Sequence, residues 1–376
     1  MISQNRRLTM KDNQAKYPQL RFKGFTDPWE QRKLEKLVDV RSGHDYKHLN
    51  RGNIPVYGTG GYMLSVDKAL SENEDAIGIG RKGTIDNPFL LKAPFWTVDT
   101  LFYVVPRVDY NLNFVNSIFQ KINWKKYDES TGVPSLSKST INSVIISFPS
   151  YEEQKQIGTF FQQLDKTIAL HQRKLTKLKE LKQGYLQKLF PENGSKFPQL
   201  RFAGFADAWE QRKLGDITKI STGKLDANAM VENGKYDFYT SGIKKYRIDV
   251  AAFEGPSITI AGNGATVGYM HLADNKFNAY QRTYVLQEFL VDRSFIFSEI
   301  GNKLPKKIKQ EARTGNIPYI VMDMLTELKL SIPQNNSEQQ KIGSFFKQLD
   351  DTIDFHQRKL EKLQELKKGY LQKMFC

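Results

Sequence analysis

The sequence contains one cysteine, Cys376, which is its last residue. A single cysteine excludes an internal disulfide and a zinc site built from cysteines. No apolar run approaches the roughly 18 residues of a membrane-spanning helix, and the N-terminal residues lack the apolar stretch of a secretory signal peptide. We therefore expect a cytoplasmic protein with no segment in the membrane.

Signatures of the common nucleotide-binding and hydrolytic enzymes are also absent, including the Walker A loop, H-E-x-x-H and any convincing Ser/His/Asp arrangement. Residues 78–83 fit the G-x-G-x-x-G pattern of dinucleotide sites, but the corresponding residues 259–264 do not. Residues 86–89 faintly resemble the D/N-P-P-Y/F motif of amino methyltransferases, although Asn87 replaces a required proline and no partner motif for S-adenosylmethionine is visible. We predict that this chain has no catalytic residue and no metal site.

The charge balance is strongly basic. The 376 residues include 56 Lys and Arg against 41 Asp and Glu, which gives a formal net charge of +15. A surplus of this size attracts a protein to polyanions. A basic surface that serves only solubility is the alternative, but Lys- and Arg-rich loops interleaved with Tyr, Trp and Gly favour nucleic acid. The length and the 39% hydrophobic content allow two or more globular domains.

The chain contains two pairs of near-copies. Residues 16–34 (KYPQLRFKGFTDPWEQRKL) return at 196–214 (KFPQLRFAGFADAWEQRKL) with 15 of 19 positions identical. Residues 152–190 return at 337–375 with 27 of 39 positions identical. The two variable blocks between these copies resemble each other only faintly. A tandem duplication with constant frames and divergent inserts indicates one scaffold that holds two recognition modules of different specificity.

The second repeated segment is typical of a long helix. It has no proline, and large residues recur at alternating steps of four and three, which is the pattern of a heptad seam. The seam residues expected to pack between helices are Ile157, Phe161, Leu164, Ile168, Leu175, Leu178, Ile342, Phe346, Leu349, Ile353, Leu360 and Leu363. Each copy also begins with a capping-box arrangement, Ser150 with Glu153 and Asn335 with Glu338. The pattern predicts two long helices.

Each helix alone would leave its seam in water, so we expect the two copies to pair about a pseudo-twofold axis as an antiparallel coiled coil. Pairing of each helix with another protein is the alternative. Apolar residues off the seam leave room for a docked partner as well: Phe160, Leu181, Leu186, Phe345, Leu366 and Leu371. His171 and His356 occupy matching seam positions, where a register-fixing polar pair is commoner than a metal site. His44 and His48 lack a third ligand.

The variable blocks, about 35–150 and 215–335, have the pattern of loop-rich α+β domains. Short β-type runs occur at Ile54–Tyr57, Ala76–Ile79, Leu101–Val105 and Val144–Phe148, and at Phe238–Thr240, Ser257–Ile260, Thr283–Leu286 and Leu328–Ile332. One helical stretch interrupts each block, near Leu112–Ile122 and Val291–Ile300. The predicted fold class is α+β, with two loop-rich α/β domains joined by two long helices in an antiparallel coiled coil and a pseudo-twofold internal repeat.

A weak common skeleton links the two blocks. Residues 77–83, 97–100 and 131–134 fall opposite 258–264, 279–282 and 314–318. Gly, Pro and β-branched residues persist there, while the side chains able to touch a ligand change. Such changes suit base recognition, because Arg and Lys pair with guanine edges and Asn and Gln with adenine. The candidate DNA contacts are Thr59, Tyr62, Arg81, Lys82, Thr100, Ser137, Lys138, Ser241, Lys244, Lys245, Asn263, Gln281 and Arg282.

The order of constant and variable segments resembles the specificity subunit (HsdS) of type I restriction–modification enzymes. The similarity lies in PQLRF-x-GF-x-D-x-WEQRKL and in the helical runs FF-x-QLD-x-TI, HQRKL and GYLQK, as in the family's low-GC Gram-positive members. The residues before each helix fit as well, namely 131–136 with Phe148-Pro149 and 314–318 with Ile332-Pro333. The resemblance covers nearly the whole chain after about residue 16.

This resemblance implies a DNA-binding specificity subunit with no cofactor of its own. Each variable block would be a target-recognition domain for one half of a bipartite, asymmetric double-stranded DNA site, and the helices would set the gap between the halves. Two modification subunits would bind S-adenosylmethionine and methylate adenine, and restriction subunits with translocase activity would use ATP and Mg²⁺. The implied segments are a flexible N-terminus (1–15), the first target-recognition domain (16–150), the central helix (151–190), the second target-recognition domain (191–335) and the C-terminal helix (336–376).

Two other classes of function stay open on the residues alone. The chain could be a self-sufficient DNA methyltransferase or nuclease with a cryptic site in one block, which turnover by the purified chain without partners would reveal. It could also be a coiled-coil scaffold that binds only proteins. Strong, salt-sensitive DNA affinity would count against the scaffold.

Overall fold

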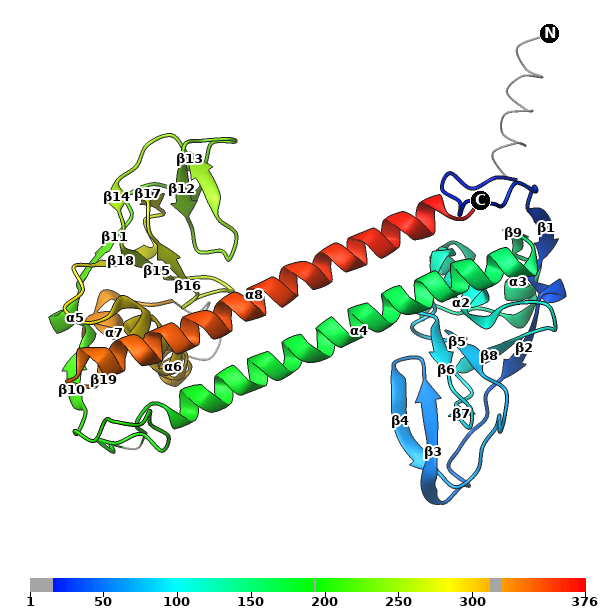
Figure 1. Cartoon of the computed structure of the whole chain (residues 1–376), viewed down its shortest axis with the longest axis horizontal. Coiled ribbons are helices and arrows are strands. Elements are labelled where there is room, and N and C mark those ends of the chain that lie inside the picture. Colours follow the sequence, from blue (N-terminus) through cyan, green and yellow to red (C-terminus); the bar gives the residue numbers. More distant parts are fainter. Residues whose placement is uncertain (1–15, 193, 312–318) are drawn as a thin grey trace, which may run out of the picture. The chain divides into compact units, whose positions relative to one another are not determined.

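The computed structural model describes residues 16–192, 194–311 and 319–376 (Figure 1). The predicted flexible segment 1–15 lies outside the described residues. The chain divides into two compact units, of which the first is built from two separate segments and the second from one continuous segment. The first unit combines the chain up to Gln172 with Arg358–Cys376, and the second unit is Arg173–Gln357. Our segment boundaries gave each long helix a segment of its own, whereas each compact unit takes in part of both helices.

The first unit contains an α/β domain that begins with the PQLRF run. Its elements are β1 (Glu30–Lys33), the 3-10 turn η1 (Leu34–Lys36), β2 (Val38–Ser42), β3 (Arg51–Gly58), β4 (Gly61–Val66), β5 (Ala76–Gly80), β6 (Phe89–Leu91), β7 (Trp96–Thr97), β8 (Leu101–Pro106), α2 (Leu112–Lys121), η2 (Trp124–Tyr127), α3 (Lys138–Ser143) and β9 (Ile145–Phe148). The strands form sheets of order β2-β8-β5-β6 and β4-β3-β7, and β1 pairs antiparallel with β9. Helix α2 packs its apolar face on the larger sheet.

The second unit repeats this plan. Its elements are β10 (Glu210–Lys213), α5 (Leu214–Ile217), β11 (Lys219–Thr222), η3 (Ala227–Ala229), β12 (Tyr236–Tyr239), β13 (Tyr246–Ile248), β14 (Phe253–Glu254), β15 (Ser257–Ala261), β16 (Met270–Ala273), β17 (Lys276–Ala279), β18 (Thr283–Gln287), α6 (Arg293–Glu311), α7 (Met322–Thr326) and β19 (Lys329–Ile332). The sheets are β11-β18-β15-β16 and β13-β12-β17-β14, and β10 pairs with β19. The order β11-β18-β15-β16 corresponds to β2-β8-β5-β6.

The predicted fold class is confirmed, and the eight predicted strands and both predicted block helices are present. The second block helix is longer than predicted, because α6 continues to Glu311. The remaining strands, β1 and β10 among them, were not predicted from the sequence. Every residue of β1 is exposed, so its EQRK sequence carries no alternation of apolar and polar residues. Strands β1 and β10 form because β9 and β19 offer them a hydrogen-bonding edge.

The long helices are α4 (Tyr151–Lys188) and α8 (Asn336–Lys373). In the first unit the beginning of α4 lies against the end of α8, where the ring centroids of Phe160 and Tyr370 are 5.1 Å apart. In the second unit the end of α4 lies against the beginning of α8, with Tyr185 and Phe345 at 5.0 Å. This pairing of early with late residues makes the helices antiparallel within each unit.

The predicted seam residues are all buried or half-buried, and Ile157, Phe161, Ile342 and Phe346 belong to the cores of the α/β domains. Ile157, Phe161, Leu175, Ile342, Phe346 and Leu360 are buried, and Leu164, Ile168, Leu178, Leu349, Ile353 and Leu363 are half-buried. Two ion pairs bridge the helices beside them. Lys367 Nζ lies 2.5 Å from Asp165 Oδ1 in the first unit, and Lys182 Nζ lies 2.5 Å from Asp350 Oδ1 in the second.

The PQLRF runs fasten one helix end to the other. In the first unit, the Leu20 N–H donates to the Lys373 carbonyl at the end of α8 (2.8 Å). The neighbouring Arg21 donates to both carboxylate oxygens of Glu153 at the start of α4, each at 2.7 Å. The second unit repeats both contacts: Leu200 donates to Lys188, and Arg201 donates to Glu338. We call each set of contacts a helix-end clamp.

The clamps revise the predicted capping boxes. Glu153 and Glu338 were expected to bond back to the helix start, but their carboxylate oxygens accept from arginines far away in sequence. Both glutamate side chains are essentially inaccessible to solvent, so each needs a cationic partner. Asn335 does cap α8, because its Oδ1 accepts from the Ser337 N–H at 2.9 Å.

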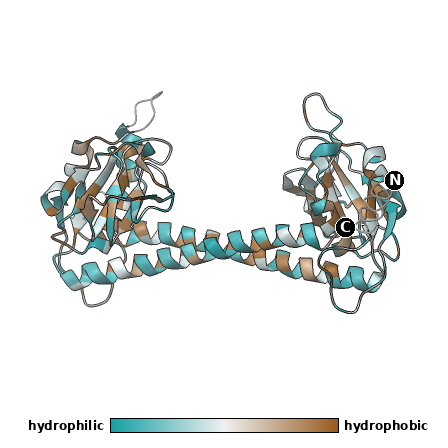
Figure 2. Cartoon of the chain, turned by 90° about the horizontal axis from the view of Figure 1, so that it is seen from above, coloured by the Kyte–Doolittle hydropathy of each residue, from teal (hydrophilic) through white to brown (hydrophobic). Residues whose placement is uncertain are grey.

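An aromatic cluster lies beside each clamp. In the first unit Trp29, Phe114 and Phe161 surround Phe375, whose ring stacks on Phe114 at 5.6 Å. In the second unit the rings in the same arrangement are Trp209, Phe295, Phe346 and Phe190. Hydrophobic residues gather in this way inside each α/β domain, as the brown segments of Figure 2 show. Each core therefore needs a phenylalanine from just beyond the end of a long helix.

Replacing Arg21 with alanine leaves the Glu153 carboxylate buried without its partner, so we expect a loss of about 3–5 kcal/mol of unfolding free energy. Urea denaturation followed by circular dichroism measures this loss. Arg32→Ala is the matched control, because it removes an exposed pair with Glu30 and should cost at most about 1 kcal/mol. Equal losses for the two variants would contradict the clamp.

Candidate nucleic-acid interface

In the first domain, three loops meet at one end of the sheet formed by β5 and β8. We call this meeting point the junction. Arg81 follows β5, and its N–H donates to the carbonyl of Thr100, which precedes β8, at 2.8 Å. The Leu136 N–H donates to the Arg81 carbonyl at 2.9 Å and ties in the third loop. Gly83 has a φ of +97°, which a residue with a side chain rarely adopts. The turn at Gly83 lets the chain fold back beside Pro134, whose carbonyl accepts from the Gly83 N–H.

The second domain builds the same junction with different residues. The Gly262 N–H donates to the Arg282 carbonyl at 2.8 Å, and the Ile320 N–H donates to the Gly262 carbonyl at 2.7 Å. An isolated bridge joins Asn263 to Tyr319, as one joins Lys82 to Ser135 in the first domain. The expected match of 314–318 lies outside the described residues. The backbone scaffold is shared, and the side chains that it presents differ.

Five of the seven candidate contacts of the first domain form three groups. Arg81 and Lys82 are exposed at the junction, and Thr59 and Thr100 are half-buried beside them. Tyr62 is 63% exposed on β4, and its hydroxyl lies 3.2 Å from that of Ser65.

Two further candidates of the first domain have other surroundings. The Ser137 hydroxyl accepts from the Thr140 N–H and donates to Glu129, so it caps α3. Lys138 lines a hollow with Glu35 and Asp39, beside the part of β2 that pairs with the end of β8. These roles could not be predicted from the sequence, because a serine that caps a helix and a serine that contacts DNA have the same sequence signal.

In the second domain, the Ser241 hydroxyl hydrogen-bonds to Asn263 Oδ1 and brings two candidate contacts together. Gln281 and Arg282 are exposed at the junction. Lys244 and Lys245 lie on a separate loop, where the Lys245 ammonium stands 5.4 Å from the centre of the Tyr239 ring.

His271 also lies in this neighbourhood, although it was not predicted as a candidate contact. Its ring packs against Tyr239 and Tyr269 at centroid distances of 5.1 and 4.9 Å. Burial first, and then the charge of Lys245, lower the pKa of His271 to about 4. The histidine is therefore neutral near pH 7, and the positive charge of this patch comes from lysine.

The junction of the second domain opens into a hollow of about 360 Å³. Its lining comprises Gly262, Gln281, Arg282, Tyr284, Tyr319, Ile320, Val321 and Met322. The floor is Tyr284, which is 8% exposed and donates its hydroxyl to the Ile320 carbonyl at 2.8 Å. Tyr319, at 58% exposed, was not predicted as a contact. The only sequence signal for it is its place directly after residues 314–318, which fall opposite 131–134.

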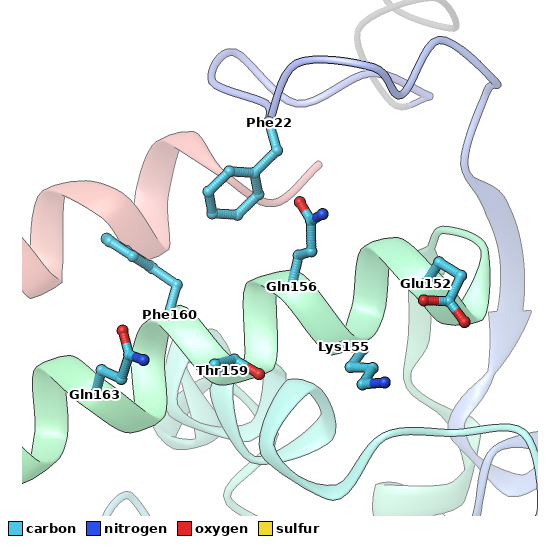
Figure 3. Close-up of a pocket in the computed structure, with 7 residues that line it drawn as sticks. All are labelled: Phe22, Glu152, Lys155, Gln156, Thr159, Phe160 and Gln163. Atoms are coloured by element: carbon cyan, nitrogen blue, oxygen red, sulfur yellow. The ribbon is translucent and has the colours of Figure 1, made fainter.

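A second surface lies on the constant segments, where a hollow of about 470 Å³ runs beside the first half of α4 (Figure 3). Phe22 enters it from the PQLRF run and faces Phe160 of α4, with the ring centroids 6.0 Å apart. Gln156, Thr159 and other α4 side chains complete its lining. Phe202 and Phe345 form the same edge-to-face pair in the second unit, at 6.1 Å.

The described residues contain no group of three or more His, Cys, Asp or Glu side chains that could hold a metal ion. The G-x-G-x-x-G match at 78–83 falls on β5 and the following turn, in an antiparallel sheet and without a helix after it. In the part of the chain that the structure describes, no helix combines the length and apolarity that a membrane crossing requires.

One acid of the second domain is fully buried. Glu299 of α6 accepts from the Ser331 N–H at 3.1 Å, and the Lys303 ammonium lies 4.0 Å away. Burial is the largest effect on this carboxyl and raises its pKa to about 7. The corresponding residue of the first domain is the buried Ile118, so the acid belongs to one domain alone.

Comparisons with known proteins agree with the duplication. A family model described as the type I restriction modification DNA specificity domain matches residues 26–180 and 206–365. The chain is 34% identical over 164 residues to the type I restriction enzyme EcoDI specificity subunit of Escherichia coli, which covers 44% of this chain. That alignment spans only 36% of the length of the Escherichia coli protein.

Two other relatives align over most of the chain. The type I restriction enzyme MjaVIII specificity subunit of Methanocaldococcus jannaschii is 23% identical over 334 residues, or 79% of this chain and 74% of the relative. The crystal structure of a type I restriction-modification system S subunit from M. genitalium has a TM-score of 0.79 at 17% identity. The match covers 96% of this chain and 99% of the other, so the two proteins share a fold.

Glu299 should make the stability of the second domain fall as pH rises. Its pKa is higher in the folded chain than in the unfolded chain, so the stability that it contributes is complete below about pH 4.5 and is lost through about pH 7. We expect the wild type to lose up to about 3 kcal/mol relative to Glu299→Gln between pH 5 and 8. Urea denaturation at both pH values tests this difference, with the exposed Glu327→Gln as control. Parallel pH dependence of wild type and Glu299→Gln would contradict the assignment.

Proposed function

We propose, from the premise that this chain belongs to the family of type I restriction modification DNA specificity domains, that it is the non-catalytic subunit that recognises a two-part DNA site. The observation that carries the proposal is the pair of junctions. One backbone arrangement occurs twice, and the side chains exposed on it differ between the copies. Two recognition domains with separate specificities are the simplest use of such a pair.

Charge supports double-stranded DNA as the ligand. The net charge of +15 favours a polyanion, and Arg81, Lys82 and Arg282 are exposed at the junctions. Lysine and arginine at such positions can contact phosphates and bases alike. We assign base recognition to the two junctions and backbone contacts to the surrounding basic loops.

The two long helices would set the distance between the half-sites. A paired α4 and α8 is stiffer than a single helix, and the clamps hold the helix ends to the domains that they serve. The number of base pairs left unrecognised between the half-sites would then depend on helix length.

Methylation and cleavage would come from other subunits. Modification subunits would bind S-adenosylmethionine and methylate adenine, and restriction subunits with translocase activity would use ATP and Mg²⁺. This division of labour agrees with a sequence that has neither a Walker A loop nor a recognisable methyltransferase motif pair.

The hollow between Phe22 and Phe160 is our candidate docking surface for a modification subunit. It is built from constant segments, and its aromatic pair recurs as Phe202 and Phe345. A surface that is repeated beside two variable domains suits two identical partners. We therefore propose two modification subunits, one on each copy.

Sequencing of methylated adenines in cells that express this chain with its modification subunit tests the function directly. We expect a split motif with a fixed gap, since two domains bind at a fixed separation. Exchange of residues 35–150 for the corresponding block of a relative should replace one half of the motif and leave the other half unchanged. A continuous motif, or a change in both halves, would contradict the proposal.

The variant Thr159→Arg should block docking of a modification subunit at one copy of the surface. Ser344 is the corresponding exposed residue of the other copy, so the double variant Thr159→Arg with Ser344→Arg should block docking at both. Light scattering of co-purified complexes should then find two modification subunits on the wild type, one on the single variant and none on the double. Ala169→Arg, exposed on α4 outside the hollow, is the control. Unchanged stoichiometry would place the docking surface elsewhere.

A further inference from the structure

Each recognition domain has one arginine at its junction. The same backbone hydrogen bond occurs in both junctions, and the arginine is its donor residue in the first domain and its acceptor residue in the second. The Arg81 N–H donates to the Thr100 carbonyl, and the Gly262 N–H donates to the Arg282 carbonyl. Arg81 therefore corresponds to Gly262, and Thr100 corresponds to Arg282. The first domain carries its guanidinium after β5, and the second carries it before β18.

Glycine is required at position 262, just after β15 and opposite Arg282. A Cβ atom on Gly262 would lie 2.3 Å from the Arg282 carbonyl oxygen and 3.0 Å from the ring of Tyr284. The backbone would have to move before any side chain could stand there. In the second domain, the junction can thus receive a guanidinium only from the facing residue, which is arginine.

Most guanidinium donors of these two arginines are unused among the described residues. Six other arginines are held by carboxylates, namely Arg21, Arg32, Arg41, Arg201, Arg247 and Arg293. Arg81 has one long hydrogen bond, 3.5 Å to the Asp99 carbonyl, and its guanidinium lies 5.8 Å from the centre of the Phe102 ring. Among the described residues, Arg282 makes no side-chain hydrogen bond or ion pair, and it borders the open hollow above Tyr284.

An exposed guanidinium with free N–H donors can donate two parallel hydrogen bonds to two acceptor atoms that lie in one plane. Guanine offers its O6 and N7 atoms at the spacing of two arginine N–H groups, and this bidentate contact distinguishes it from the other bases. The residue before Thr100 in the first domain and before Arg282 in the second also differs, and each type suits a different base. Asp99 could accept from the N4 amino group of cytosine, and the corresponding Gln281 suits adenine.

We propose that Arg81 and Arg282 are the guanine-recognising residues of the two domains, so that each half-site contains one G·C pair that depends on its own arginine. This inference rests on the proposed function and adds the base and the residue. A phosphate contact is the competing role for both arginines, because it would supply affinity without sequence information.

The test compares Arg81→Met and Arg282→Met with the wild type. Methionine keeps an unbranched stem and removes every donor. We expect Arg81→Met to broaden one G·C position of one half-site to any base pair and to leave the other half-site intact, with the reverse outcome for Arg282→Met. In competition binding with defined duplexes, the preference for G·C at that position should fall by about 5- to 150-fold.

Arg51→Ala is the matched control, since Arg51 is exposed in the first domain and lies outside the junction. It should leave the motif unchanged. Broadening at a position other than G·C would overturn the proposal. An unchanged motif with uniformly weaker binding and a smaller salt dependence would also overturn it, because that result indicates a phosphate contact. If a variant gives no methylation in cells, competition binding of the purified chain to the defined duplexes shows whether the preference for G·C has been lost. The absence of any split motif in the wild type would refute the proposed function instead.

Discussion

The buried arginine–glutamate pair in each helix-end clamp is the constraint on which the rest of the architecture depends. A carboxylate with no solvent access must be matched by a cation, and Arg21 and Arg201 supply it from the PQLRF runs. The adjacent leucine N–H groups take the last carbonyls of the opposite helices. Each clamp therefore ties three chain segments together, namely the start of one long helix, the end of the other and the first residues of a recognition domain.

The clamps explain why the constant segments stay constant in both copies. The aromatic cluster of each unit is completed by a phenylalanine from beyond a helix end, Phe375 in the first and Phe190 in the second. Each core includes residues at the ends of the long helices, so a change in the constant segments would disturb both the domain and the helix pair. The side chains of the junction loops do not hold a domain to the helix pair. These side chains differ between the two copies, while the backbone hydrogen bonds persist.

Sequence reasoning succeeded where periodicity or repetition carries the signal. The heptad spacing located both long helices, and β-type runs located four strands in each recognition domain. It failed where a contact joins distant segments: nothing in EQRK indicates a strand, and nothing near Glu153 indicates Arg21. The site divides in the same way. Comparison of the two blocks drew attention to Arg81 and Arg282, but the capping role of Ser137 and the exposure of Tyr319 depend on three-dimensional surroundings.

The central claim is that the paired helices fix the separation of two independent DNA-recognition domains. The most direct measurement inserts one heptad into α4 after Gln172 and one into α8 after Gln357, which keeps the seam in phase, and then sequences the methylated motif. At about 1.5 Å per residue, the account predicts a gap longer by roughly three base pairs, with both half-sites unchanged. An unchanged gap, or a change in the bases recognised, would contradict it.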